Sequence, residues 1–272
     1  MNEPTALPAL GATLAFVACA APLVVLALRG ASRRLARRES PPHRWPSGEA
    51  TAILLLPFVL VLPLSALMAG AGKEGEPEVL PALLGSQLLL AGPCALAVFL
   101  AMRRPLGLAS LGLTIPPPRG YGWAVLQVYL PGALVFYGLA TAWLHVCRAM
   151  GWEERQEIVK LILTLEHGEL WAAALVAALV GPFLEELLFR GFLQGFMAQV
   201  VGERWALVAS SALFASLHGV PGLPSLFLLS LFLGWLQLRT RSLWVPYFAH
   251  ALHNAVSLTV ALAAAGAVEG GA

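Results

Sequence analysis

The sequence has few charged residues for its length. Asp, Glu, Lys and Arg make up 12% of 272 residues, whereas soluble domains contain about 25%. The net charge of +2 is small, and no basic stripe alternates with aromatic residues, so the composition argues against a nucleic-acid partner. With 58% of the residues hydrophobic, we expect the chain to lie in a lipid bilayer.

Cysteine is also scarce. Cys19, Cys94 and Cys147 lie far apart and form no CxxC pair, which excludes a disulfide framework and a zinc ribbon. The leader MNEPT lacks positive charge, and the basic residues follow the first apolar run instead of preceding it. A signal peptide has the opposite arrangement, so we expect a retained membrane anchor.

Long apolar runs are abundant, and they divide the chain into about eight membrane spans of roughly 20 residues each. We therefore predict an all-α, polytopic membrane protein. Residues 1–164 are expected to form N-terminal helices and loops, and residues 165–266 the later helices of the same integral membrane domain. The spans are expected at 8–28, 51–71, 80–102, 122–146, 169–200, 204–219, 223–239 and 242–266.

Basic loops predict the orientation of these spans. RRLARR, Arg103 with Arg104, and RTRS all fall in odd-numbered loops. Because cytoplasmic loops carry an excess of Lys and Arg, we expect these loops in the cytoplasm. Both termini then lie on the non-cytoplasmic side of the cell membrane.

EELLFR places two carboxylates and a guanidinium inside an apolar run. A carboxylate near the bilayer centre costs about 2.5–3.5 kcal/mol on the mildest scale, so such groups are expected to face partners. Glu186 and Arg190 are four residues apart and can pair on one helical face. Glu185 points about 100° away and is free for another role.

Later apolar runs carry further polar residues. They are His218 in LFASLHGV, and His250, His253 and Asn254 in FAHALHNAV. His250 and Asn254 share a helical face, whereas His253 only flanks it. Each histidine alone is more typical of a satisfied core residue. Taken together, Glu185, His218, His250 and Asn254 suggest one site.

This set of residues could perform hydrolysis. A carboxylate beside a histidine can hold a water molecule and remove its proton, and a second histidine and an amide can donate hydrogen bonds to the resulting oxyanion. Glu185, His218 and His250 are also legitimate zinc ligands, but HExxH is absent. We therefore favour activation of water without a cofactor, and zinc stays the alternative.

The motifs resemble those of the CPBP family of intramembrane proteases, the type II CAAX prenyl endopeptidase group. EExxxR stands here as Glu185, Glu186 and Arg190, FxxxH as Phe214 and His218, and HxxxN as His250 and Asn254. The resemblance implies an endopeptidase whose catalytic core is residues 165–266, with an intramembrane polar cavity between the helices. It makes Glu185 the base and His218 the water positioner. It gives His250 and Asn254 the oxyanion hole, and Glu186, Arg190 and Phe214 supporting roles.

The resemblance further implies a peptide or membrane-protein substrate. Cleavage near the C-terminus of a prenylated, otherwise lipidated or sorting-tagged protein would fit the family. Two readings from other classes stay open, because intramembrane Glu and His also build proton-coupled transporters, and a non-catalytic scaffold could retain the motif. A transporter should show matching broken helices in two halves, and we find no such symmetry in the sequence.

Overall fold

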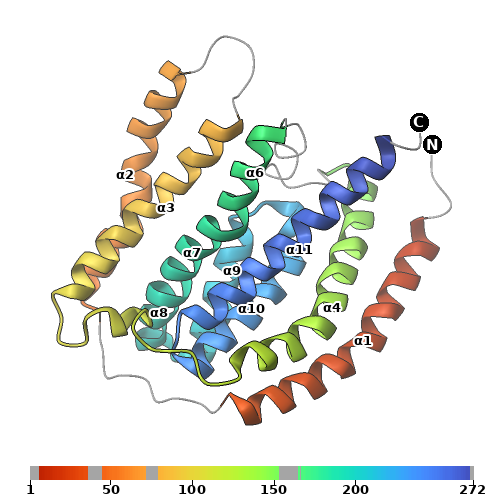
Figure 1. The fold of residues 1–272 in the computed structure, drawn as a ribbon, viewed down its shortest axis with the longest axis horizontal. Helices are drawn as coiled ribbons and strands as arrows, with labels where there is room; N and C mark the ends of the chain where they lie inside the picture. Colours follow the sequence, from red (N-terminus) through yellow and green to blue (C-terminus); the bar gives the residue numbers. More distant parts are fainter. Residues whose placement is uncertain (1–5, 36–44, 72–78, 153–164, 166, 270–272) are drawn as a thin grey trace.

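The computed structural model of the chain describes residues 6–35, 45–152, 165 and 167–269, apart from 72–78. All regular elements in these residues are helical (Figure 1), which confirms the predicted fold class. The long helices are α1 (Ala6–Arg34), α2 (Ser47–Ala71), α3 (Val79–Met102), α4 (Tyr121–Met150), α10 (Leu223–Thr240) and α11 (Trp244–Glu269).

A continuous helical run connects five short elements between residues 167 and 201. These elements are α6 (His167–Leu175), η2 (Val176–Val180), α7 (Gly181–Glu186), η3 (Leu187–Leu193) and α8 (Gln194–Val201), of which η2 and η3 are π-helical. The predicted span at 169–200 is therefore one long helix with two π-helical interruptions. Such interruptions are frequently found at functional sites.

Five helices are long and apolar enough to cross a membrane, judged on the described residues alone. They comprise 10–34, 84–102, 121–150, 169–201 and 220–240. The predicted count of eight is not confirmed. Helix α9 (Glu203–Ser216) has 14 residues and is about 21 Å long, which is shorter than a hydrocarbon core of about 30 Å.

The helices pack around two apolar clusters. One cluster joins α3, η3 and α9 through residues such as Ala97, Phe192 and Phe214. The other joins α1, α4, α10 and α11 through residues such as Ala31, Val128 and Leu233. Helices α2 and α3 pack on each other and lie at one side of the bundle (Figure 1).

The link between α10 and α11 is held by the segment before α4, which contains η1 (Gly107–Leu111). Ser242 Oγ donates to the carbonyl of Ile115, Trp244 Nε1 donates to that of Leu113, and Leu243 N–H donates to that of Gly112. These bonds fix the start of α11, and therefore the height of His250 along it.

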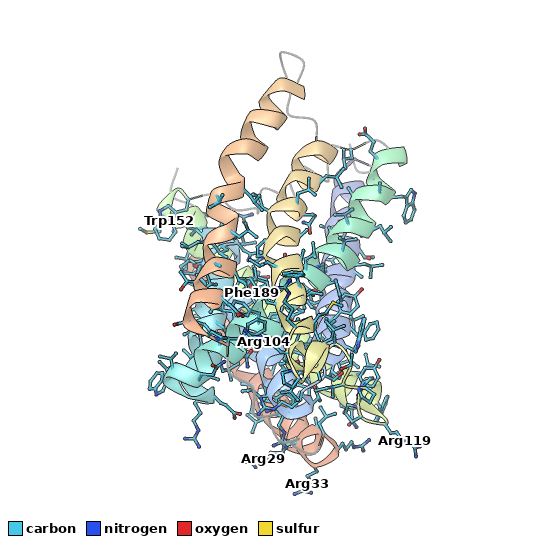
Figure 2. The ribbon with its side chains drawn as sticks, turned by 90° about the vertical axis from the view of Figure 1, so that its left-hand side faces the viewer. Arg29, Arg33, Arg104, Arg119, Trp152 and Phe189 are labelled. Carbon is cyan, nitrogen blue, oxygen red and sulfur yellow. The ribbon has the colours of Figure 1, made fainter. Side chains whose placement is uncertain are left out.

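Arginines mark one end of the bundle. Figure 2 shows Arg29, Arg33 and Arg119 at the same end. Arg239 Nη2 donates to the carbonyl of Ser32, which places the end of α10 there as well. We call this the basic end. The predicted boundary between 164 and 165 adjoins residues outside the described part of the chain, and it stays a prediction.

Candidate active site

Glu185 lies between two imidazoles. Its Oε1 is 4.0 Å from Nε2 of His218, and its Oε2 is 3.7 Å from Nε2 of His250. The Glu185 side chain is 18% exposed and that of His218 is 27% exposed, so both can meet solvent or substrate. Both distances exceed a direct hydrogen bond of about 2.7–3.2 Å, and a small molecule can bridge the carboxylate and an imidazole.

His218 does not lie within a helix, contrary to the predicted span at 204–219. Helix α9 ends at Ser216, and His218 follows in a turn closed by its N–H bond to the carbonyl of Ala215. Its Nδ1 is 2.7 Å from the carbonyl oxygen of Phe214. Because a carbonyl only accepts hydrogen bonds, Nδ1 carries the proton, and Nε2 faces Glu185.

Glu186 and Arg190 form a fully buried pair. Arg190 Nε lies 3.3 Å from Oε2 of Glu186, and Oε1 of that carboxylate is 2.9 Å from Nδ1 of His250. The guanidinium also donates from Nη2 to Oγ of Ser230 at 3.1 Å. The i,i+4 pairing expected from the sequence is thus present, although Arg190 lies in π-helical η3.

The carboxylates give His250 a defined orientation. Glu186 accepts from Nδ1 and so fixes the ring, in the way that a carboxylate orients a catalytic histidine in serine hydrolases. This leaves His250 Nε2 pointing at Glu185. The two glutamates therefore contact opposite nitrogens of one buried imidazole, and they have different surroundings.

Asn254 makes its described hydrogen bond away from the glutamates. Its Nδ2 donates to the carbonyl of Ala177 at 2.9 Å, and Ala177 lies in π-helical η2. The two site residues on α11 therefore contact different elements of the helical run at 167–201. His250 lies beside α7, and Asn254 lies one helical turn further on, beside η2.

The ring of Phe214 packs against the imidazoles of His218 and His250. Its ring centroid is 4.5 Å from that of His218 and 5.7 Å from that of His250. The guanidinium carbon of Arg190 lies 4.9 Å from the same ring centroid, within reach of a cation–π contact. Phe214 therefore contacts both imidazoles and the guanidinium.

His253, which was predicted only to flank the site, contacts aromatic residues of α4 instead. It is buried, stacks on Tyr137 with centroids 5.6 Å apart, and has its Nδ1 3.5 Å from the hydroxyl of Tyr129. Both tyrosines come from α4. His253 thus anchors α11 to α4.

Sequence reasoning missed three buried polar residues near Arg190. They are Ser230, Gln194 and Gln237. The glutamines stand in the apolar strings FLQGF and GWLQL, which is the same signal that singled out EELLFR. Ser230 carried no such signal, because serine is tolerated in membrane helices through bonds to its own backbone.

The described residues contain no group of three His, Cys, Asp or Glu side chains arranged to hold a metal ion. The zinc alternative drew on Glu185, His218 and His250. In the structure, Nδ1 of His250 is bonded to Glu186, so its remaining ring nitrogen is the one available to any ligand.

Residues 167–256 match the family described as type II CAAX prenyl endopeptidase Rce1-like. The predicted family resemblance is confirmed for this region. We call residues 167–256 the Rce1-like region, and all the predicted site residues lie within it. The helices that carry them include spans of membrane length, as expected for a membrane-bound peptidase family.

A second comparison agrees with the first. The chain is 29% identical over 150 residues to YdiL, a predicted membrane peptidase of Bacillus subtilis (strain 168). The alignment covers 53% of this chain and 55% of YdiL, so the chain spans about half the length of that relative. No solved structure matches the chain.

Proposed function

We propose that the chain is an intramembrane endopeptidase in which Glu185 activates the attacking water. The arrangement of Glu185 between Nε2 of His218 and Nε2 of His250 carries this proposal. A carboxylate flanked by two imidazoles, partly open, and supported by a fully buried carboxylate–guanidinium pair suits general base catalysis. The match of the surrounding region to an endopeptidase family supports the same reaction.

In the proposed reaction, a water molecule sits between Glu185 and His218. Because Nδ1 of His218 bonds to the Phe214 carbonyl, Nε2 is an acceptor that can receive one hydrogen of the water. Glu185 accepts the other and takes the proton as the oxygen attacks the substrate carbonyl. The same carboxyl group then delivers the proton to the leaving amine.

The negative charge that develops on the carbonyl oxygen needs donors. With Nδ1 held by Glu186, His250 is oriented to offer a donor from Nε2. Because Nδ1 already donates to Glu186, donation from Nε2 requires a second ring proton on His250. Asn254 is the proposed second donor, through the amide hydrogen that does not bond to Ala177.

This mechanism uses only side chains of the chain itself. Glu186 and Arg190 act as positioning residues for His250, and Phe214 supports both imidazoles. The proposed substrate is a peptide segment at the membrane, near the C-terminus of a prenylated, otherwise lipidated or sorting-tagged protein. The description of the matched family as a prenyl endopeptidase supports the class of reaction and, among these substrates, the prenylated one.

Glu185→Gln tests the proposal. The change keeps the size of the side chain but removes the base, so we expect peptide cleavage to fall by at least about 100-fold. The protein is purified in lipid nanodiscs and incubated with a peptide library, and the products are identified by mass spectrometry. Helix content and thermal midpoint should match those of the unmodified protein.

Glu169→Gln provides the matched control. It makes the same chemical change at the exposed start of the same helical run and should leave cleavage unchanged. Retained cleavage in folded Glu185→Gln protein would refute the role of the carboxylate. Elemental analysis of active protein and assays with chelators test the zinc alternative separately.

A further inference from the structure

A cavity of about 250 Å³ has Arg190 in its wall. We call it the polar chamber. Its lining residues come from η3, α8, the C-terminal end of α10 and the segment around η1, and they include Ser110, Arg190, Gln194, Gly195, Gln237 and Arg241. Glu185, His218 and His250 are not among its lining residues.

Three buried polar groups of the chamber have unused hydrogen-bonding atoms. Arg190 and Gln194 are each 2% exposed and Gln237 is 9% exposed. Within the described part of the chain, Nη1 of Arg190 and the Oε1 atoms of both glutamines have no hydrogen-bond partner. Leaving a buried donor or acceptor unpaired costs about 1–3 kcal/mol, so three at one cavity point to a bound ligand.

Two of these side chains, Gln194 and Arg190, are oriented by hydrogen bonds from another of their atoms. Nε2 of Gln194 donates to the carbonyl of Gly234 at 3.1 Å, and Nη2 of Arg190 donates to Ser230. These bonds orient the Gln194 amide with its oxygen free. The chamber thus presents one unused donor and two unused acceptors, of which those of Arg190 and Gln194 are oriented by these bonds.

Charge balance decides the class of ligand. Arg190 is paired with Glu186, and Arg241 is paired with Glu203 through an Nη2–Oε1 distance of 2.5 Å. The chamber therefore has little uncompensated charge to attract an anion or a cation. A small neutral molecule that both donates and accepts hydrogen bonds fits the three atoms, and water is the simplest of these.

Open space and access support the same ligand. A Cβ atom added at Gly195 would meet nothing within 4 Å, so this wall faces free volume. The chamber extends to Arg241, next to the end of α10, and α10 ends at the basic end. A volume of about 250 Å³ accommodates several water molecules, each of which takes about 30 Å³ in the liquid.

We propose that the polar chamber is a water-binding site that hydrates Arg190 from the basic end. Water molecules accept from Nη1 of Arg190 and donate to Oε1 of Gln194 and of Gln237. This hydration stabilises a guanidinium that would otherwise be desolvated within a membrane helix.

Cysteine accessibility tests this proposal without any assay of activity. With exposed Cys19 replaced by Ser, Ala198→Cys places a thiol on the chamber wall. Met197→Cys is the matched control, because Met197 is the adjacent residue and packs against an apolar cluster. Arg33→Cys marks the basic end. Each protein is reconstituted in vesicles and treated on either side with a charged, membrane-impermeant methanethiosulfonate reagent.

We expect Ala198→Cys to react from the same side as Arg33→Cys and about tenfold faster than Met197→Cys, because a thiol ionises more readily beside water. Adding Gly195→Leu should fill the chamber and reduce the Ala198→Cys rate to that of Met197→Cys. Equal slow rates for the two thiols, or a fast rate that Gly195→Leu leaves unchanged, would overturn the proposal.

Unchanged labelling of Arg33→Cys in each variant confirms that the protein is folded and inserted. The same labelling can be run in the Glu185→Gln background. The result for the chamber therefore stands whether or not peptide cleavage is found, and failure of one proposal is distinguishable from failure of the other.

Discussion

At the scale of single residues, the two adjacent glutamates have separate surroundings. Glu186 is fully buried against Arg190 and His250, whereas Glu185 is partly exposed between two imidazoles. A helical rotation of about 100° between neighbours is sufficient to give them these different environments. This asymmetry is the physical basis for assigning the base to Glu185 and the positioning role to Glu186.

Asn254 offers a test at this scale, because its bond to Ala177 is also compatible with a purely structural role. If its second amide hydrogen stabilises the oxyanion, Asn254→Ala should lower kcat by about 100-fold or more. The KM should change little, since this donor acts mainly in the transition state. Steady-state kinetics on a cleaved peptide measure the two parameters.

Ser257→Ala is the control for this substitution. Ser257 lies one turn from Asn254 on α11, and its Oγ is 2.8 Å from the hydroxyl of Tyr137. Its loss removes a side-chain hydrogen bond of α11 without touching η2. If Asn254→Ala lowers the thermal midpoint and leaves kcat intact, Asn254 supports η2 rather than the reaction.

At the scale of elements, the connection between α10 and α11 depends on Gly112. Its φ of 78° lies in the left-handed region, and an added Cβ would lie 2.9 Å from the carbonyl oxygen of Arg241. This close approach allows the backbone bond from Leu243 to Gly112. Any side chain at 112 must therefore push the start of α11 away.

We expect Gly112→Ala to destabilise the protein by about 2 kcal/mol through the left-handed conformation and the contact. The thermal midpoint in detergent should fall by about 5 °C. Gly122→Ala is the control, because a Cβ at Gly122, near the start of α4, meets nothing within 4 Å. Equal midpoints for the two variants would contradict the proposed role of Gly112.

The sequence predicted the parts of the site that follow from helical spacing and polarity. Spacing of four placed Glu186 beside Arg190, and polar residues in apolar runs marked Glu185 and His250. It did not predict the π-helical turns of η2 and η3, because a widened turn depends on tertiary packing and not on local propensity. For the same reason, the bond from Asn254 to Ala177 was not foreseen.

The predicted helical position of His218 was wrong. The apolar run at 204–219 suggested one span, but α9 ends at Ser216 and Gly219 adopts a φ of 76°. Glycine readily adopts such conformations and commonly ends helices. Gly219 in LHGV therefore indicated a helix end, but the prediction from hydropathy did not take it into account. The turn allows Nε2 of His218 to face Glu185 from outside the helix.

At the scale of the whole molecule, charge is distributed unequally between the two ends of the bundle. Arg29, Arg33 and Arg119 lie at the basic end, and Trp152 lies nearer the other end (Figure 2). Helix α1 begins and α11 ends away from the basic end (Figure 1). This arrangement agrees with the positive-inside rule if the basic end is cytoplasmic. In that case both termini are on the non-cytoplasmic side, as predicted from the loop charges.

Topology labelling in intact cells decides this orientation. With Cys19 replaced, Arg33→Cys should resist an impermeant thiol reagent until the cells are opened, whereas Trp152→Cys should react at once. Segments with an excess of Lys and Arg stay on the cytoplasmic side of the membrane. The segment after α4 has no comparable excess of positive charge. The reverse pattern would place the basic end outside. It would also mean that the polar chamber takes its water from the non-cytoplasmic side.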